Sequence, residues 1–132
     1  MAKIQTFRDL IAWQKSMMLV NRIYETTRRM PEDERFGLTN QMRRAAVSIP
    51  SNIAEGYARQ TTADYIKFLK TARGSLAELM TQVQIALDLK MIPLDRPMMD
   101  LLSEVDRILQ GLIRSLEEKL LKRRRAAGPT TT

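Results

Sequence analysis

The chain has 132 residues, a length that matches one domain able to bury its own hydrophobic core. It contains neither cysteine nor histidine, which excludes disulfides, catalytic thiolates and the usual zinc, copper and haem ligands, so we expect no metal and no cofactor. Lysine and arginine number 22 against 15 acidic residues, and the net charge of +7 favours polyanionic partners, although small basic proteins without such partners are common.

The first predicted element is a helix over about residues 9–29. Asp9 or Thr6 is its expected N-cap, and the pattern stops at Pro31. Apolar residues at steps of three or four draw one stripe that we expect to face the core: Leu10, Trp13, Met17, Val20, Tyr24 and Thr27. Residues 31–35 suit a short helical turn, because proline fits the first helical position and acids favour the positive end of the turn.

A second helix is predicted over about residues 38–59, with Pro50 inside it as an expected kink. Its core face comprises Leu38, Met42, Ala45, Ile49, Ile53 and Gly56. A polar stripe follows beside this face: Gln41, Arg44, Ser48, Asn52, Glu55 and Arg59. This stripe suits a structural network or a binding surface. We favour the network, with Glu55 paired to Arg44, because such side chains commonly satisfy buried polar groups.

The third face of this helix is rich in small residues and carries one charge in about five turns. Plain surface of low charge density is one interpretation, and a patch covered by another subunit is the other. We favour an oligomer interface, because small residues permit close approach of helices and isolated exposed patches are uncommon. The expected interface residues are Val47, Pro50, Ser51, Ala54 and Ala58.

Two longer helices complete the chain. The third follows Thr61 or Thr62 as N-cap, stops before Pro93 and carries this stripe: Tyr65, Phe68, Leu69, Ala72, Leu76, Leu79, Val83, Ala86 and Leu87. Asp95 and Pro97 open the fourth, whose stripe is Met98, Leu101, Val105, Ile108, Leu112, Leu116 and Leu120.

These elements predict an all-α, up-down-up-down four-helix bundle over residues 1–125 and a disordered tail over 126–132. A three-helix bundle with the second helix at its periphery is the alternative, because that helix is weak in large apolar residues. The sequence has neither a run of about 18 apolar residues nor a secretion leader, so we expect a cytoplasmic protein. Without His, Cys or a glycine-rich phosphate loop we expect no enzyme, even though Glu55 and Glu78 are interior acid candidates.

Positive charge is clustered. The candidate phosphate contacts are Arg43, Lys67, Lys70, Arg73, Lys119, Lys122, Arg123, Arg124 and Arg125. Cations at the end of the fourth helix also complement the negative end of its dipole, which is the plainer interpretation of that run. Aromatic residues make up 5% of the chain, and no base-reading motif is present, so any nucleic-acid contact should be to phosphate and shape.

Three motifs carry a family resemblance: FxxLxxW at residues 7–13, GLTxQxxRAAxSIPxNIAEG at residues 37–56 and GSLxEL at residues 74–79. Over about residues 4–120 the chain resembles the bacterial four-helix-bundle proteins first noticed as products of intervening sequences in large-subunit ribosomal RNA genes. The resemblance implies a ring-shaped homopentamer. It also implies a relation to the accessory proteins of diversity-generating retroelements, which bind their reverse transcriptase and RNA.

Two functions follow as hypotheses. The first is an oligomeric basic bundle that binds structured RNA or a ribonucleoprotein through phosphates. The second is a protein-interaction scaffold, for example an accessory subunit of a reverse transcriptase, in which the charge is secondary. No catalytic residues are implied by the resemblance, and a membrane-surface role is not favoured because the basic tail lacks an amphipathic aromatic partner.

Overall fold

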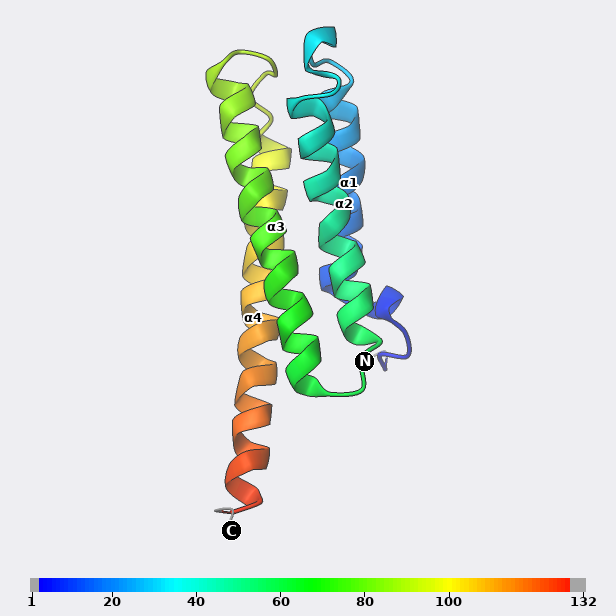
Figure 1. The fold of residues 1–132 in the computed structure, drawn as a ribbon, viewed down its shortest axis with the longest axis vertical. Helices are drawn as coiled ribbons and strands as arrows, with labels where there is room; N and C mark the ends of the chain where they lie inside the picture. Colours follow the sequence, from blue (N-terminus) through cyan, green and yellow to red (C-terminus); the bar gives the residue numbers. More distant parts are fainter. Residues whose placement is uncertain (1–2, 129–132) are drawn as a thin grey trace.

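A computed structural model of the protein describes residues 3–128, which form four α-helices (Figure 1). These are α1 (Ile11–Thr27), α2 (Leu38–Tyr57), α3 (Thr62–Asp88) and α4 (Arg96–Ala126), with short 3₁₀ turns η1 (Phe7–Asp9) and η2 (Glu32–Glu34) before α1 and α2. The described residues contain no strand, so the all-α prediction is confirmed. Within the same residues, no helix combines the length and apolar character needed to cross a membrane.

The helices run alternately up and down, and each packs against two neighbours in the cyclic order α1, α2, α3, α4 (Figure 1). α2 packs against α1 and, more extensively, against α3, and its predicted core residues are buried or half-buried. The alternative with a peripheral second helix is therefore wrong. Pro50 is buried inside α2, where it lacks the N–H for the helical hydrogen bond, and the kink expected there stays a prediction.

Side-chain caps fix where the two long helices begin. The Thr61 hydroxyl accepts a hydrogen bond from the Asp64 backbone N–H at 3.1 Å, which starts α3. The Asp95 carboxylate accepts one from the Met98 backbone N–H, also at 3.1 Å, which starts α4. Both residues were predicted as caps, because hydroxyl and carboxylate oxygens satisfy the free N–H groups of a first helical turn.

The residues predicted to cap the first helix cap the short turn η1 before it instead. Thr6 and Asp9 form a capping box around η1, in which the Asp9 carboxylate accepts the Thr6 N–H at 3.0 Å. Backbone hydrogen bonds from Gln5 and Thr6 lower the pKa of Asp9 below its usual value. α1 itself starts after Leu10 and has no side-chain cap.

The core face of α1 differs from the predicted stripe by one residue position. The buried residues of α1 are Ala12, Ser16, Leu19, Ile23, Thr26 and Thr27. Trp13 and Val20 lie half-buried beside them, and Met17 is 36% exposed, so its assignment to the core was wrong. Residues one position apart differ by about 100° around a helix. Two of the buried residues of α1, Ala12 and Ser16, have small side chains, and the Ser16 hydroxyl donates a hydrogen bond to the Ala12 carbonyl.

The end of α2 and the start of α3 pack closely together, next to the loop that connects them. A Cβ atom added at Gly56 would lie 2.7 Å from Phe68 Cβ and 3.1 Å from Tyr65 Cδ1. Glycine is therefore required here by the spacing of the two helices. The Tyr65 ring meets Tyr57 edge-to-face at 6.0 Å between centroids, and burial raises the pKa of Tyr65 to about 12.

α4 is the longest element, with 31 residues against 17 in α1. Its C-terminal end continues past the connection between α2 and α3 (Figure 1). Residues 119–126, which we call the α4 overhang, are exposed apart from Leu120, which is half-buried. The helix extends through Ala126, one residue into the predicted tail, and residues 129–132 of that tail lie outside the described part of the chain.

Candidate nucleic-acid interface

The α4 overhang gathers five of the predicted phosphate contacts: Lys119, Lys122, Arg123, Arg124 and Arg125. All five are exposed, and none forms an ion pair within residues 3–128. Arg123 donates a hydrogen bond to the Thr62 hydroxyl at 3.2 Å, which holds it over the start of α3. Because they occupy successive helical positions, these cations point in several directions around the helix and form a region of high positive potential.

The predicted cations on α3 have different surroundings. The Lys70 ammonium lies 3.1 Å from the Glu117 carboxylate, and the Arg73 Nε donates to Asp106 at 3.0 Å. Both ion pairs join α3 to α4, and they lower the positive potential of this face. Lys67 is exposed and forms no ion pair with another described residue.

Arg43 does not join these cations. Its Nε donates to the Thr27 hydroxyl at 2.9 Å, and its guanidinium lies 4.5 Å from the centroid of the Tyr24 ring. These contacts tie α2 to the C-terminal end of α1, at the opposite end of the bundle from the α4 overhang (Figure 1). The geometry gives Arg43 an intramolecular structural contact, far from the other predicted phosphate contacts, and its predicted role as a phosphate ligand stays a prediction.

Four of the five predicted interface residues of α2 line a shallow groove that α2 shares with α1. The groove has a volume of about 300 Å³, and its lining residues are uncharged: Trp13, Met17, Val20, Val47, Pro50, Ser51 and Ala54. Pro50 is buried within the protomer, and Ala58 is exposed outside the groove. Three of the lining residues, Trp13, Met17 and Val20, belong to α1. Sequence reasoning missed their contribution to the groove, because it had assigned all three to the core.

The predicted polar network on α2 is smaller than expected. Ser48 and Ser75 share a hydrogen bond of 2.8 Å between α2 and α3, and the Asn52 amide donates to the Ser48 carbonyl at 2.8 Å. The expected pairing of Glu55 with Arg44 is wrong: Glu55 pairs with Arg59 at 3.4 Å, one helical turn away, whereas Arg44 lies three turns away. Gln41 and Arg44 are exposed and form no side-chain hydrogen bond within the described residues.

The comparisons with known proteins agree with this fold. A family model described as 23S rRNA-intervening sequence protein matches residues 8–114. The chain belongs to this family.

A solved structure similar to this member of the 23S rRNA-intervening sequence protein family is a protein of unknown function from the S23 ribosomal protein family of Bacteroides thetaiotaomicron VPI-5482. The identity is 23%, the alignment covers 78% of this chain and 98% of that chain, and the TM-score is 0.72. At this identity the likeness shows the four-helix fold alone. No curated protein matches the sequence.

In this intervening sequence protein, sequence reasoning also missed the acids that meet the α3 cations. Asp106 and Glu117 were not singled out, and neither were Gln110 and Arg114 beside them. The charges were visible in the sequence. Which of them face α3 depends on the rotation of α4, and apolar periodicity alone defines that rotation only to within about one residue position.

Proposed function

We propose that this protein is a non-catalytic, homo-oligomeric basic protein of the cytoplasm that binds structured RNA through phosphate contacts. The α4 overhang carries the proposal, because five exposed cations without carboxylate partners among the described residues form a site for a polyanion. Contacts from lysine and arginine to phosphates carry no information about the bases, so the shape of the RNA should decide which one is preferred. The family description refers to 23S rRNA, which makes RNA the first polyanion to test.

The uncharged groove between α1 and α2 supports self-association as part of this function. A second copy is the proposed occupant, because two basic protomers repel each other least where their surfaces are uncharged. A closed ring, as the family resemblance implies with five copies, would repeat the α4 overhang around one axis. Several weak phosphate contacts would then act together on one RNA.

Neutralising the overhang tests RNA binding. Changing Lys122, Arg123, Arg124 and Arg125 together to glutamine should weaken binding of a fluorescent structured RNA by at least about tenfold at low salt. The slope of log affinity against log salt should flatten by up to about 3, because up to four phosphate contacts are lost. Fluorescence anisotropy across a salt series, with nuclease-treated protein, measures both quantities.

The matched control removes the same net charge from the opposite end of the bundle, by changing Arg28, Arg29, Lys90 and Arg96 to glutamine. This control should bind RNA much more tightly than the overhang variant. Equal losses in the two variants would mean that net charge alone attracts RNA. If the unchanged protein does not bind RNA, the proposed function fails and the scaffold alternative gains support.

Replacing Ala54 by arginine tests self-association. The α1–α2 groove is apolar, so an arginine there would be buried without a partner in the assembly, and the mass should fall from a multiple of 15.2 kDa towards 15.2 kDa. Light scattering coupled to size-exclusion chromatography measures this mass, and circular dichroism checks that helicity is kept. Thr81→Arg, on an exposed position of α3, is the control and should leave the mass unchanged. Equal masses for both variants would place the interface elsewhere.

A further inference from the structure

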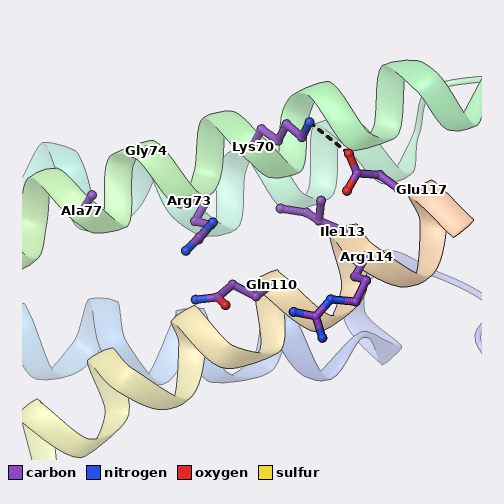
Figure 2. Close-up of a pocket in the computed structure, with 8 residues that line it drawn as sticks. All are labelled: Lys70, Arg73, Gly74, Ala77, Gln110, Ile113, Arg114 and Glu117. Carbon is purple, nitrogen blue, oxygen red and sulfur yellow. Dashed lines mark ion pairs between the residues drawn. The ribbon is translucent and has the colours of Figure 1, made fainter.

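A second basic surface lies in a groove between α3 and α4, with a volume of about 530 Å³ (Figure 2). Lys70 and Arg73 line it from α3, and Arg114 lines it from α4. Gly74 and Ala77 line the groove on the α3 side, and nothing lies within 4 Å of the position that a Cβ atom on Gly74 would occupy. The groove therefore combines three cations with an open space between the helices.

Two of the three cations in this groove are held by carboxylates that solvent reaches. In the Lys70–Glu117 pair the two side chains are 57% and 50% exposed, and the Arg73–Asp106 pair is also open to solvent. Ion pairs in water are weak, because solvent screens them and both side chains lose conformational freedom. Arg114 forms no ion pair within residues 3–128. A phosphate entering the groove would meet one unpaired guanidinium and could replace weakly held carboxylates on the other two cations.

This groove continues into the α4 overhang. A neighbouring groove of about 320 Å³ is lined by Ala63, Ile66, Glu117, Leu120, Leu121 and Arg124, and Glu117 lines both. From Arg114 to Arg124 the helix rises by about 15 Å, which is long enough for contacts to several successive phosphates of one strand. We call the two grooves together the α3–α4 seam. Glu117 is the acidic residue that lines it, and it lies near the middle.

We propose that the α3–α4 seam guides an RNA phosphodiester backbone from the overhang towards Arg114 and Arg73, and that Glu117 limits its affinity. The carboxylate of Glu117 opposes phosphate in two ways: it occupies Lys70, and it places a negative charge where the two grooves meet. This inference rests on the proposed RNA-binding function and specifies the path that the RNA would follow along the surface.

Removing the negative charge of Glu117 should therefore strengthen the binding of RNA. Glu117→Gln is expected to bind the structured RNA about fivefold more tightly at low salt, because Lys70 is released and one repulsive charge is lost. Glu118→Gln is the matched control: it makes the same change of net charge at the next residue, which is exposed and lines neither groove. Its effect should be less than about twofold.

Combined variants show whether the gain acts through the seam. In a Lys70→Gln background, Glu117→Gln should lose the part of its gain that comes from releasing Lys70 and keep the part that comes from removing the repulsive charge. Arg114→Gln alone should weaken binding several-fold. Equal affinities of the Glu117→Gln and Glu118→Gln proteins would overturn the seam. If the overhang variant is still weakened in that case, RNA binding stands and only the seam fails. An unchanged protein that shows no salt-dependent RNA binding would overturn both.

Discussion

Replacing Gly56 by alanine is expected to destabilise the bundle by about 1–3 kcal/mol, although alanine is the better helix former by about 1 kcal/mol. The added methyl group would lie 2.7 Å from Phe68 Cβ and 3.3 Å from the Tyr65 carbonyl oxygen. Both atoms belong to the α3 backbone or are attached directly to it, so no side-chain rotation relieves the contact. The two helices must move apart, and the core contacts around them are weakened.

Urea unfolding followed by circular dichroism measures this loss, at one fixed protomer concentration because self-association would contribute to the stability. Gly111→Ala is the control. It makes the same substitution inside α4, where nothing lies within 4 Å of the added atom, and it should stabilise the protein by up to about 1 kcal/mol. A Gly56→Ala protein as stable as the Gly111→Ala protein would contradict the close contact between α2 and α3.

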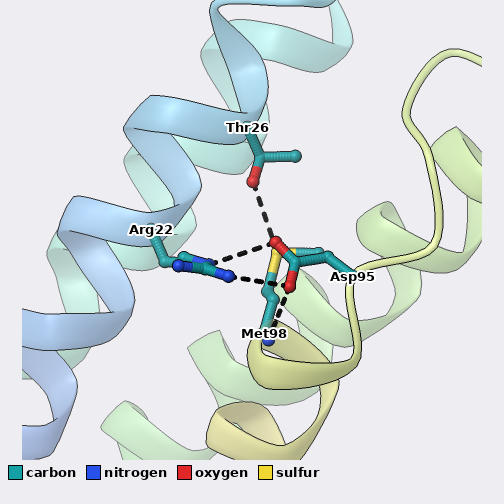
Figure 3. A network of polar contacts seen from close by, with 4 residues as sticks. All are labelled: Arg22, Thr26, Asp95 and Met98. Atoms are coloured by element: carbon teal, nitrogen blue, oxygen red, sulfur yellow. Dashed lines mark hydrogen bonds and ion pairs between the residues drawn. The ribbon is translucent and has the colours of Figure 1, made fainter.

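Replacing Asp95 by alanine is expected to cost about 1–2 kcal/mol, because one carboxylate serves two purposes (Figure 3). It caps α4, and it accepts hydrogen bonds from Arg22 Nε at 3.1 Å and Nη2 at 3.0 Å, which joins the start of α4 to α1. Asp95→Asn should cost less, since asparagine caps helices as well as aspartate does. The difference between the variants separates the cap from the charge, and urea unfolding at neutral pH measures it.

The pH dependence of stability gives a second readout for Asp95. Hydrogen bonds from Arg22, and then from the Met98 N–H, lower the pKa of Asp95 below its ordinary value of 3.8. The folded protein therefore favours the ionised carboxylate, so this contribution is complete well above pH 3.8 and is lost as the pH falls through the folded-state pKa. The stability gap between the unchanged protein and Asp95→Asn should close over that acidic range. If this stability difference persists at acidic pH, the charge of Asp95 is not its cause.

The sequence was sufficient for many features that depend on one helix at a time, but not for the core faces of α1 and α4. In α4 the buried residues are Leu102, Leu109 and Ile113, next to the predicted Leu101, Ile108 and Leu112, which are half-buried. Helix number, the core faces of α2 and α3, and the caps Thr61 and Asp95 agree with the structure, because periodicity and capping are local. The core face of α1 was misplaced, since the buried Ser16 and Ala12 contribute little hydrophobicity compared with Met17.

Contacts between helices were harder to foresee. Arg22 is 73 positions from Asp95, and Arg73 is 33 positions from Asp106. Whether such charges meet depends on how each helix is rotated and shifted along its axis. Those two variables are decided by packing of the whole core, and no single stretch of sequence contains them.

The α4 overhang also has a thermodynamic consequence for the helix that forms it. Its five cations repel one another across successive turns, and these turns lack a full set of packing partners to offset the repulsion. The favourable interaction of the same charges with the helix dipole opposes this effect in part. A bound polyanion would neutralise the repulsion, so ligand affinity and the stability of the last helical turns are two measures of one linked equilibrium.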